Sequence, residues 1–461
     1  MAATGAPPNR TARDDLTPDG AADRGALGVE EVAARVPGRA GAPAISWRRN
    51  LWAIWAAQIL AIVGFSLRVP FLPFYLADLG VRGDEALALW TGMVNAGGAG
   101  VMMVAAPLWG ILADRHGRRP MLIRAAFAGA ATVGLMALAT QPWHLLALRL
   151  VEGAFTGTVT ASTVLVASTT PKARLGYALG MVQTAVFAGA SLGPLFGGVL
   201  ADRIGPRPTF LVAGGCLAVS GLLVVVFVRE RFVPAPRSPR AERATSGTPL
   251  SRLRASGGFL LAGPMLVLIG LLFGVRMASS AVQPIVPLYV WQLAPDIGDA
   301  SSLAGLTLGA LGLTSAVSAV FLGRLGDRRD HRHVLLVATA VGGALYLPMA
   351  LAREPWHLVG LMALFGVAAG GIVPSANALV AEATPVERRG TVFGVTAAAS
   401  SAGGFVGPLL GAGVAAAHGF RAPFVLTGAI LLALAALAGR QLALRSRRPR
   451  AGTPEGTDGE R

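Results

Sequence analysis

Apolar stretches long enough to cross a lipid bilayer recur along this chain. Segments of about twenty or more residues with one charge or none are found from Leu51 to Leu444. A helix rises 1.5 Å per residue, so each can cross a hydrocarbon core of about 30 Å. Only 14% of the 461 residues are charged, whereas about 25% is usual in soluble domains. We therefore predict an all-α, polytopic membrane protein and exclude an ordinary soluble enzyme.

Twelve of these stretches are predicted to be transmembrane helices. The seventh is overlong and contains Pro264, Pro284 and Pro287; because proline removes a helical hydrogen bond, this helix should bend or end early. Pro70 and Pro73 predict a similar bend in the first helix. The twelve segments cover residues 51–76, 87–112, 119–140, 144–168, 175–200, 208–228, 258–290, 302–324, 333–352, 356–381, 391–416 and 421–443.

Polar segments divide the chain. Residues 1–46 have no periodicity and no apolar signal-peptide core, so they are predicted to be a disordered tail. The charged, Pro/Ser-rich stretch after the sixth helix is predicted to be a linker between two six-helix halves. The expected order is a cytoplasmic tail at 1–46, a six-helix bundle at 47–229, a cytoplasmic linker at 230–256, a second bundle at 257–444 and a cytoplasmic tail at 445–461.

The distribution of basic residues predicts the orientation. With both tails inside, the inner loops carry nineteen Lys and Arg, and the outer loops carry five. An excess of basic residues on the cytoplasmic side is the usual rule for membrane proteins. We therefore expect a multi-pass protein of the cell membrane with both termini in the cytoplasm. The formal net charge of +16 is then explained by topology, and no nucleic-acid partner is expected.

The chain contains an internal repeat. The string GILADRHGRRPML, from Gly110, recurs as GRLGDRRDHRHVL from Gly323, and the pair Gly193-Pro194 recurs at 407–408. Pro73 and Tyr75 recur in the same way at positions 287 and 289. Two homologous six-helix bundles related by an axis along the membrane normal would give this pattern, with the substrate site near the midplane between them.

Cysteine and histidine give no sign of a metal or redox site. Cys216 is the only cysteine, so disulfides within the chain and cysteine-based metal sites are excluded. No set of metal ligands is apparent. We expect no cofactor, and we expect the proton gradient to drive transport. The expected partners are a small-molecule substrate, protons and the lipid bilayer, and the protein is expected to act as a monomer.

The loop between the second and third helices carries the first chemical motif. Gly110 and Gly117 permit close backbone approach and a turn, and Asp114 can cap a helix or pair with Arg115 or Arg118. The loop string resembles the signature of the major facilitator superfamily, which implies a latch that holds the two halves in the outward-facing state. A simple positive-inside anchor is the alternative.

The second copy of this loop is less complete. It keeps Gly323, Asp327 and Arg328, but it has Asp330 where the first copy has Gly117. We therefore expect the second latch to be weaker.

The fifth helix carries a run of glycines. They create a grooved face, and the proline among them bends the helix. Their spacing resembles the fifth-helix motif of drug:proton antiporters within the superfamily, and that resemblance implies antiport. Generic packing of small residues remains the alternative reading. The motif residues are Gly180, Gly189, Gly193, Pro194, Gly197 and Gly198.

The fourth helix contains the only acidic residue that falls inside a predicted helix. This is Glu152, which shares a helix face with Arg149 three residues earlier. Charges within the bilayer are costly and mark a pathway or a paired site. Arg149 resembles the fourth-helix arginine that related antiporters use in proton transfer, which implies that Glu152 titrates and Arg149 modulates it. A purely structural salt bridge is the alternative.

Two further arginines, Arg68 and Arg276, lie inside predicted helices with no acid in the same segment. Each is expected either to reach the interface with its long side chain or to line an anion-attracting cavity. Aromatic and amide side chains nearby complete a candidate substrate cavity, although membrane aromatics often face lipid instead. The candidate cavity residues are Arg68, Phe71, Tyr75, Asn95, Phe155, Arg276, Gln283 and Tyr289.

Residues 47–444 as a whole resemble a twelve-helix major facilitator transporter of the drug:proton antiporter group. The strings FSLRVPFLPFYLADLG and GILADRHGRRPMLIRAAF are most similar to bacterial multidrug-efflux proteins of the fosfomycin-resistance type. The resemblance implies proton-coupled efflux of small amphipathic molecules by alternating access. A proton-coupled uptake symporter of the same fold is the alternative. A membrane enzyme would usually show clustered catalytic side chains, which this sequence lacks.

Overall fold

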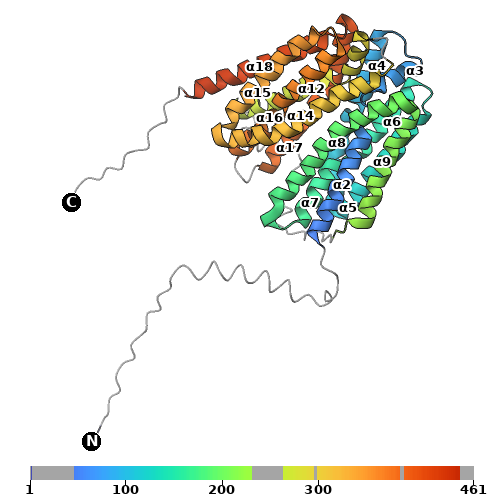
Figure 1. Cartoon of the computed structure of the whole chain (residues 1–461). Helices are drawn as coiled ribbons and strands as arrows, with labels where there is room; N and C mark the ends of the chain where they lie inside the picture. Colours follow the sequence, from blue (N-terminus) through green and yellow to red (C-terminus); the bar gives the residue numbers. More distant parts are fainter. Residues whose placement is uncertain (1, 3–45, 231–262, 295–297, 385–388, 447–461) are drawn as a thin grey trace. The chain divides into compact units, whose positions relative to one another are not determined.

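Helices make up almost all of the described chain. The structure is a computed structural model that describes residue 2 and residues 46–230, 263–294, 298–384 and 389–446, and these ranges contain no strand (Figure 1). The predicted tails at 1–46 and 445–461 and the linker at 230–256 lie almost entirely outside the described residues. The all-helical prediction is confirmed, and α18 ends two residues beyond the predicted boundary at 444.

The first half of the chain forms the helices drawn in blue to green in Figure 1. Several of them begin with proline at the first or second helical position, where its missing N–H costs nothing. The elements are α2 (Trp47–Ser66), α3 (Leu72–Asp78), α4 (Asp84–His116), α5 (Arg118–Leu135), η2 (Met136–Leu138), α6 (Pro142–Phe155), α7 (Thr158–Thr169), η3 (Lys172–Arg174), α8 (Leu175–Ile204) and α9 (Pro206–Phe227).

The second half repeats this order in yellow to red. Its elements are α12 (Gly263–Val282), α13 (Val286–Leu293), α14 (Ala300–Arg329), α15 (His331–Ala350), α16 (Pro355–Ala383), α17 (Arg389–His418) and α18 (Ala422–Ser446).

Eleven helical stretches in the described ranges are long and apolar enough to span a membrane. They correspond to the second to twelfth predicted spans. The remaining prediction corresponds to α2, which begins with Trp47-Arg48-Arg49-Asn50. This helix has 20 residues, but two arginines and an asparagine in its first turn make it less apolar than the other eleven. The helix is present at the predicted place, and its polar start lowers its mean hydropathy.

The first and seventh predicted spans are both broken at matching places. The chain leaves the helix at residues 67–71 between α2 and α3, and at 283–285 between α12 and α13. Beyond each break, a tyrosine hydroxyl donates to two backbone carbonyls: Tyr75 to Met136 and Ala139, and Tyr289 to Ala350 and Ala352, at 3.1–3.2 Å. The predicted proline bends are therefore confirmed, and the repeat extends to hydrogen bonds.

The fourth predicted span is divided, which the sequence did not predict. The chain leaves the helix at Thr156 and Gly157, where Gly157 has φ of +134°, a value that favours glycine. The matching region of the second half is continuous, because α16 runs unbroken from Pro355 to Ala383. The break is thus a feature of the first half alone, one turn from Glu152.

The glycines of α8 bring its backbone against α2. A Cβ at Gly197 would collide with the carbonyl oxygen of Leu67, and one at Gly193 would collide with the Ser66 hydroxyl. That hydroxyl donates to the carbonyl of Gly189 at 3.1 Å. The predicted grooved face is therefore the contact surface between these two helices.

The second half makes the same contact between α17 and α12. The Ser280 hydroxyl donates to the carbonyl of Gly403 at 3.2 Å, and a Cβ at Gly411 would collide with the carbonyl of Ala281. These residues are offset by 214 from their counterparts in the first half, so backbone contact through glycine is a repeated element of both bundles.

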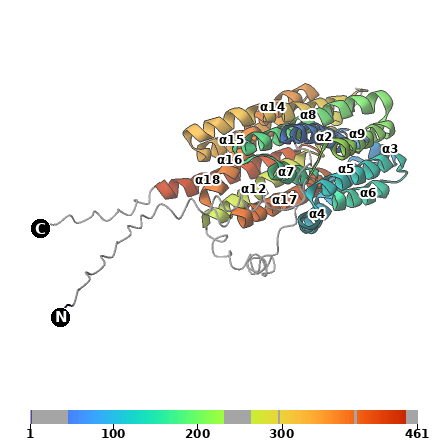
Figure 2. The ribbon, with the colours of Figure 1, turned by 90° about the horizontal axis from the view of Figure 1, so that it is seen from below.

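Within the described residues, the two halves meet mainly along two helix pairs, α8 with α14 and α4 with α17. Figure 1 shows α8 beside α14, and Figure 2 shows α17 beside α4. A Cβ at Gly305 would collide with the carbonyl of Pro194, and one at Gly92 with the side chain of Ala412. We call the side on which Trp47 and Ser446 lie the tail side, and the opposite side the far side. These contacts lie on the far side.

We expect Gly197→Ala to destabilise the protein, because the new methyl group meets backbone that cannot move aside. Overpacking of this kind costs about 1–3 kcal/mol. Gly180→Ala is the matched control on the same helix, since nothing lies within 4 Å of its Cβ position. Thermal unfolding of the purified variants would measure the difference, and equal melting temperatures would contradict the packing described above.

Candidate functional site

The site is built around Glu152, a buried carboxylate on α6. Its side chain is 2% exposed. Arg149 Nη1, one helical turn away, donates to Glu152 Oε1 at 2.6 Å, and Arg68 Nη2 donates to the same oxygen at 3.0 Å. One carboxylate oxygen is thus shared by two guanidinium groups, and we call these three residues the charged triad.

Arg68 reaches the carboxylate because it lies in the break between α2 and α3. Its side chain is 6% exposed, so it neither extends to an interface nor faces an open cavity in this conformation. The sequence analysis expected Arg68 either to reach the membrane interface or to line a cavity. In this conformation it instead forms a buried ion pair with Glu152, 84 residues away in the sequence. A separation of this size gives no local sequence signal.

Small residues make room for Arg149 between α4 and α6. Its Nε donates to the carbonyl of Val94 at 3.2 Å, and its guanidinium carbon lies 3.0 Å from the Cβ position of Gly98. A Cβ at Gly153 would collide with the carbonyl of Gly98. These two glycines let the helices approach closely enough to enclose the guanidinium group.

Two polar atoms of the charged triad have no hydrogen-bond partner in the described structure: Glu152 Oε2 and Arg68 Nη1. An unpartnered buried carboxylate oxygen is a position that a proton can occupy without breaking an existing bond. With Glu152 ionised, the triad carries two positive charges and one negative charge. Protonation would leave both arginines without a counter-ion, which is costly in a buried place. The triad can therefore couple protonation to a rearrangement of helices.

The structure separates the other candidate cavity residues into two groups. Three aromatic residues are at most 1% exposed and pack in the hydrophobic core, so they are not open to a substrate in this conformation: Phe71, Tyr75 and Tyr289. The others are accessible to different degrees. Asn95 is half-buried on α4, Phe155 ends α6 beside Trp109, Gln283 is exposed in the break after α12, and Arg276 lines a cavity.

The loop before α5 is held by an acid that the sequence analysis missed. Glu230, just after α9, accepts from the backbone N–H groups of Arg118 and Arg119 at 2.7–3.0 Å. A carboxylate at a helix N-terminus is stabilised by the helix dipole and satisfies free donors. The first loop thus takes its cap from the end of α9, 111 to 112 residues away.

In the second loop, Asp330 supplies the cap itself. It occupies the place of Gly117, and both residues have positive φ, +113° and +91°. The Asp330 carboxylate accepts from the N–H of Arg332 at 2.8 Å. The aspartate that replaces glycine therefore keeps the turn and adds a cap, which the sequence analysis did not foresee.

The remaining predicted latch residues lie on the tail side. Asp327 Oδ1 is 3.1 Å from His331 Nε2, while Arg115 and Arg328 are exposed. The side chain of Asp114 lies outside the described residues. The latch function stays a prediction.

The glycines at the tail-side ends of the four helices between the halves are open. Nothing lies within 4 Å of the Cβ positions of Gly110, Gly180, Gly323 and Gly394, which belong to α4, α8, α14 and α17. On the far side, Asp202 of α8 accepts from the N–H of Ser302 of α14 at 2.6 Å. The described contacts therefore join the halves on the far side and leave these tail-side glycines without a neighbour.

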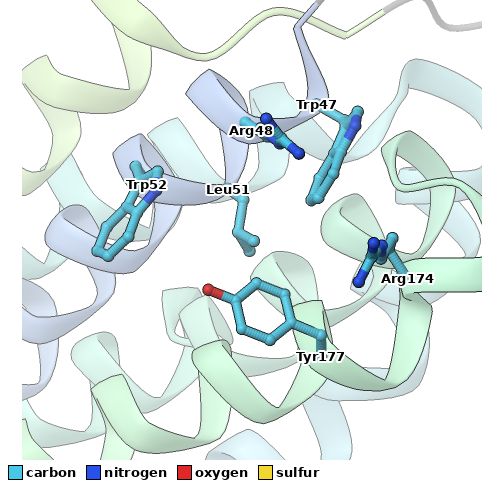
Figure 3. A pocket seen from close by; sticks show the side chains of 6 residues that line it. All are labelled: Trp47, Arg48, Leu51, Trp52, Arg174 and Tyr177. Carbon is cyan, nitrogen blue, oxygen red and sulfur yellow. The ribbon is translucent and has the colours of Figure 1, made fainter.

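A second pocket lies at the start of α2 and is shown in Figure 3. Trp47 and Trp52 of α2 face Tyr177 of α8, with Arg48 and Arg174 beside them. Arginines with amphipathic aromatic rings are typical of a membrane–water interface. This pocket is therefore separate from the charged triad, and its side chains are of the kinds that favour a membrane–water interface.

A family model of the major facilitator superfamily matches residues 54–293 and 269–460, most of the chain. This chain belongs to the major facilitator superfamily. The superfamily consists of transporters rather than enzymes, and the membership agrees with the two matching halves.

Relatives within this superfamily cover almost the whole chain. The multidrug resistance protein MdtG of Salmonella typhimurium (strain LT2) is 35% identical over 84% of this chain and 94% of that protein. MdtG of Serratia proteamaculans (strain 568) is 36% identical over 84% and 92%. The chain is thus similar to multidrug resistance proteins over most of its length.

Solved structures show the same fold. An inward-facing, unoccupied structure of a bacterial homologue of the human lysosomal transporter Spinster has a TM-score of 0.71, with 16% identity over 89% of this chain and 100% of that one. The human organic anion transporter MFSD10 has a TM-score of 0.62, with 22% identity over 85% and 99%. At these identities the likeness concerns the major facilitator fold alone.

We expect Glu152→Gln to destabilise the protein more than Arg68→Met. The first substitution leaves two buried arginines unpaired, and breaking a buried pair in this way costs about 3–5 kcal/mol. The second leaves the neutral pair of Arg149 and Glu152. Melting temperatures of the purified variants would compare them, and a larger loss for Arg68→Met would contradict the charge balance of the triad.

Proposed function

We propose that this protein is a secondary active transporter that exports small amphipathic molecules in exchange for protons. The observation that carries the proposal is the charged triad. A membrane carboxylate with one oxygen shared by two arginines and the other unpartnered is suited to bind and release a proton. In this proposal Glu152 is the proton carrier, and Arg149 and Arg68 control its protonation.

Two further findings support export of drug-like molecules. The relatives described above are named multidrug resistance proteins. The fifth-helix glycine run resembles the antiporter motif. Three of its members, Gly189, Gly193 and Gly197, pack on the end of α2 and on the start of the break that contains Arg68. A movement of α8 against α2 would therefore reach the triad.

We infer that the tail side is cytoplasmic, because the loops on that side carry most of the arginines. The far-side contacts between the halves then close the outer face, while the open glycines lie on the inner face. The described conformation corresponds to an inward-facing state, in which substrate enters from the cytoplasm.

The transport cycle follows from charge compensation. Proton binding to Glu152 would remove the counter-charge of Arg149 and Arg68 and favour a different helix arrangement. Closing the tail side would bring Gly110 and Gly180 against the second half and separate the far-side pairs. Alternating access would then move substrate outward and a proton inward across the membrane.

An uptake symporter with the same fold is the second candidate. It is favoured only by the shared architecture, whereas the glycine run and the named relatives favour export. The direction of substrate movement under an imposed proton gradient separates the two.

Glu152→Gln is expected to abolish proton-driven efflux while leaving passive substrate exchange. Glutamine mimics the permanently protonated side chain, so the carrier can move substrate but cannot release a proton. Inside-out vesicles would be given a proton gradient and the anionic dye 8-anilinonaphthalene-1-sulfonate, and both uptake and exchange of the dye would be measured. Accumulation of dye against its gradient by this variant would place proton coupling elsewhere.

Gly110→Leu is expected to fold normally and to stop turnover, because leucine blocks closure of the tail side. Spin labels replacing Tyr177 and Phe321, which are exposed on α8 and α14, would report the separation of the halves in a Cys216→Ser background. The variant should show only the long distance. Gly439→Leu on α18 is the control, since its Cβ position is also open. A short-distance population in Gly110→Leu equal to that of the wild type would contradict the assignment.

A further inference from the structure

Arg276 is a charged residue in a membrane helix that no described residue neutralises. It is the twelfth residue of the 29-residue candidate span Met265–Leu293, so it lies well inside the bilayer. Its side chain has no salt bridge and no hydrogen-bond partner among the described residues, and it is exposed. An unpaired charge at this depth is costly and marks a functional position.

The surroundings of Arg276 form a cavity of about 440 Å³ between α12, α16 and α17. Its polar lining includes the amide of Asn377 and the hydroxyls of Ser279 and Ser400, and its apolar lining includes Leu272, Val275 and Val373. Apart from Arg276, the described lining residues carry no charge. The guanidinium Nε lies 3.5 Å from the Cβ position of Gly404, so a small residue of α17 leaves room beside it.

We propose that this cavity binds the oxyanion group, a carboxylate, phosphonate or sulfonate, of an amphipathic organic anion. The proposal rests on the transport function above and names a substrate class for it. Arg276 provides the charge and planar donors that match an oxyanion. Asn377 and the two serine hydroxyls can donate to the remaining oxygens.

The apolar part of the wall selects an organic anion over a small inorganic ion. Pockets for small organic ligands have volumes of about 300–1,000 Å³ and are lined mainly by apolar groups with a few polar anchors. This cavity matches that description, and an inorganic ion alone would leave the surface of Leu272, Val275 and Val373 unused. A cationic substrate would meet Arg276 with no described acid to offset it.

The two halves differ in charge at this level. The residue 214 positions before Arg276 is Ile62, which packs against Gly189. The residues 213 positions after Arg149 and Glu152 are Met362 and Phe365, both buried. At this level the first half therefore holds the ion-paired triad, and the second half holds Arg276, which has no ion pair among the described residues. Proton binding and anion binding are assigned to different bundles.

Binding to the purified full-length protein in phosphatidylcholine nanodiscs tests the proposal. The probes are benzoate, phenylphosphonate and benzenesulfonate, with benzamide as the neutral match. We expect at least one anionic probe to raise the melting temperature of the wild type and benzamide not to do so. In Arg276→Gln the affinity should fall about tenfold or more, and Arg276→Lys should recover part of it. Arg353→Gln removes the same charge from an exposed loop and should bind as the wild type does.

Equal binding of the anions by the wild type and Arg276→Gln, or no binding of any anion by the wild type, would overturn the proposal. Nanodiscs containing phosphatidylglycerol distinguish the source of the oxyanion. If this lipid abolishes the probe effect in the wild type, the cavity holds a lipid headgroup and the substrate assignment is wrong.

The failure of this inference is distinguishable from the failure of the proposed function. Arg276-dependent anion binding without any proton-driven efflux would uphold the cavity and refute the antiporter. Proton-driven efflux together with anion binding that does not depend on Arg276 would uphold the antiporter and refute the anion site at Arg276.

Discussion

A single buried carboxylate constrains the first half of this protein. Removing a charged group from water costs several kcal/mol even after relaxation, and only good geometry with an opposite charge repays it. The desolvation cost of Glu152 is offset by its hydrogen bonds to Arg149 on the same helix and to Arg68 in the break after α2. The break in the first span, the glycines that admit Arg149 and the break after α6 all lie around this carboxylate.

Glycine contacts explain how such a site can be exposed to the two sides in turn. Where glycine places backbone against backbone, two helices are packed without long side chains that must be extracted when they separate. The far-side contacts of Gly305 with the Pro194 carbonyl and of Gly92 with the Pro408 carbonyl are of this kind. The tail-side ends of the same four helices also carry glycines, but no described atom packs against them in this conformation. The two ends of these helices thus provide matching surfaces for two closed arrangements.

Much of the fold could be predicted from sequence because its determinants are local. Apolar runs set the helices, and prolines set the breaks after α2 and α12. The repeat of Tyr75 as Tyr289 also anticipated two identical hydrogen-bond pairs. The division of α6 from α7 was missed, since Gly157 recurs as Gly370 and the latter remains helical. A glycine permits a break but does not require one.

The site was only partly predictable, because its contacts join distant segments. The proximity of Arg149 and Glu152 follows from a three-residue spacing, but nothing local assigns Arg68 to the same carboxylate. Glu230 was missed for the same reason, since its partners are at the start of α5. The candidate cavity aromatics were chosen by residue type, and Phe71, Tyr75 and Tyr289 instead pack in the core. Burial depends on the tertiary arrangement, which residue type alone does not determine.

The central claim is that Glu152 carries the proton that is exchanged for substrate, and proton release on substrate binding tests it most directly. The anionic dye 8-anilinonaphthalene-1-sulfonate would be added to the purified protein in weakly buffered detergent solution, with a pH indicator to count the protons. The wild type is predicted to release protons as the dye binds, and Glu152→Gln is predicted to bind the dye and release none. Equal proton release by both proteins would contradict the account.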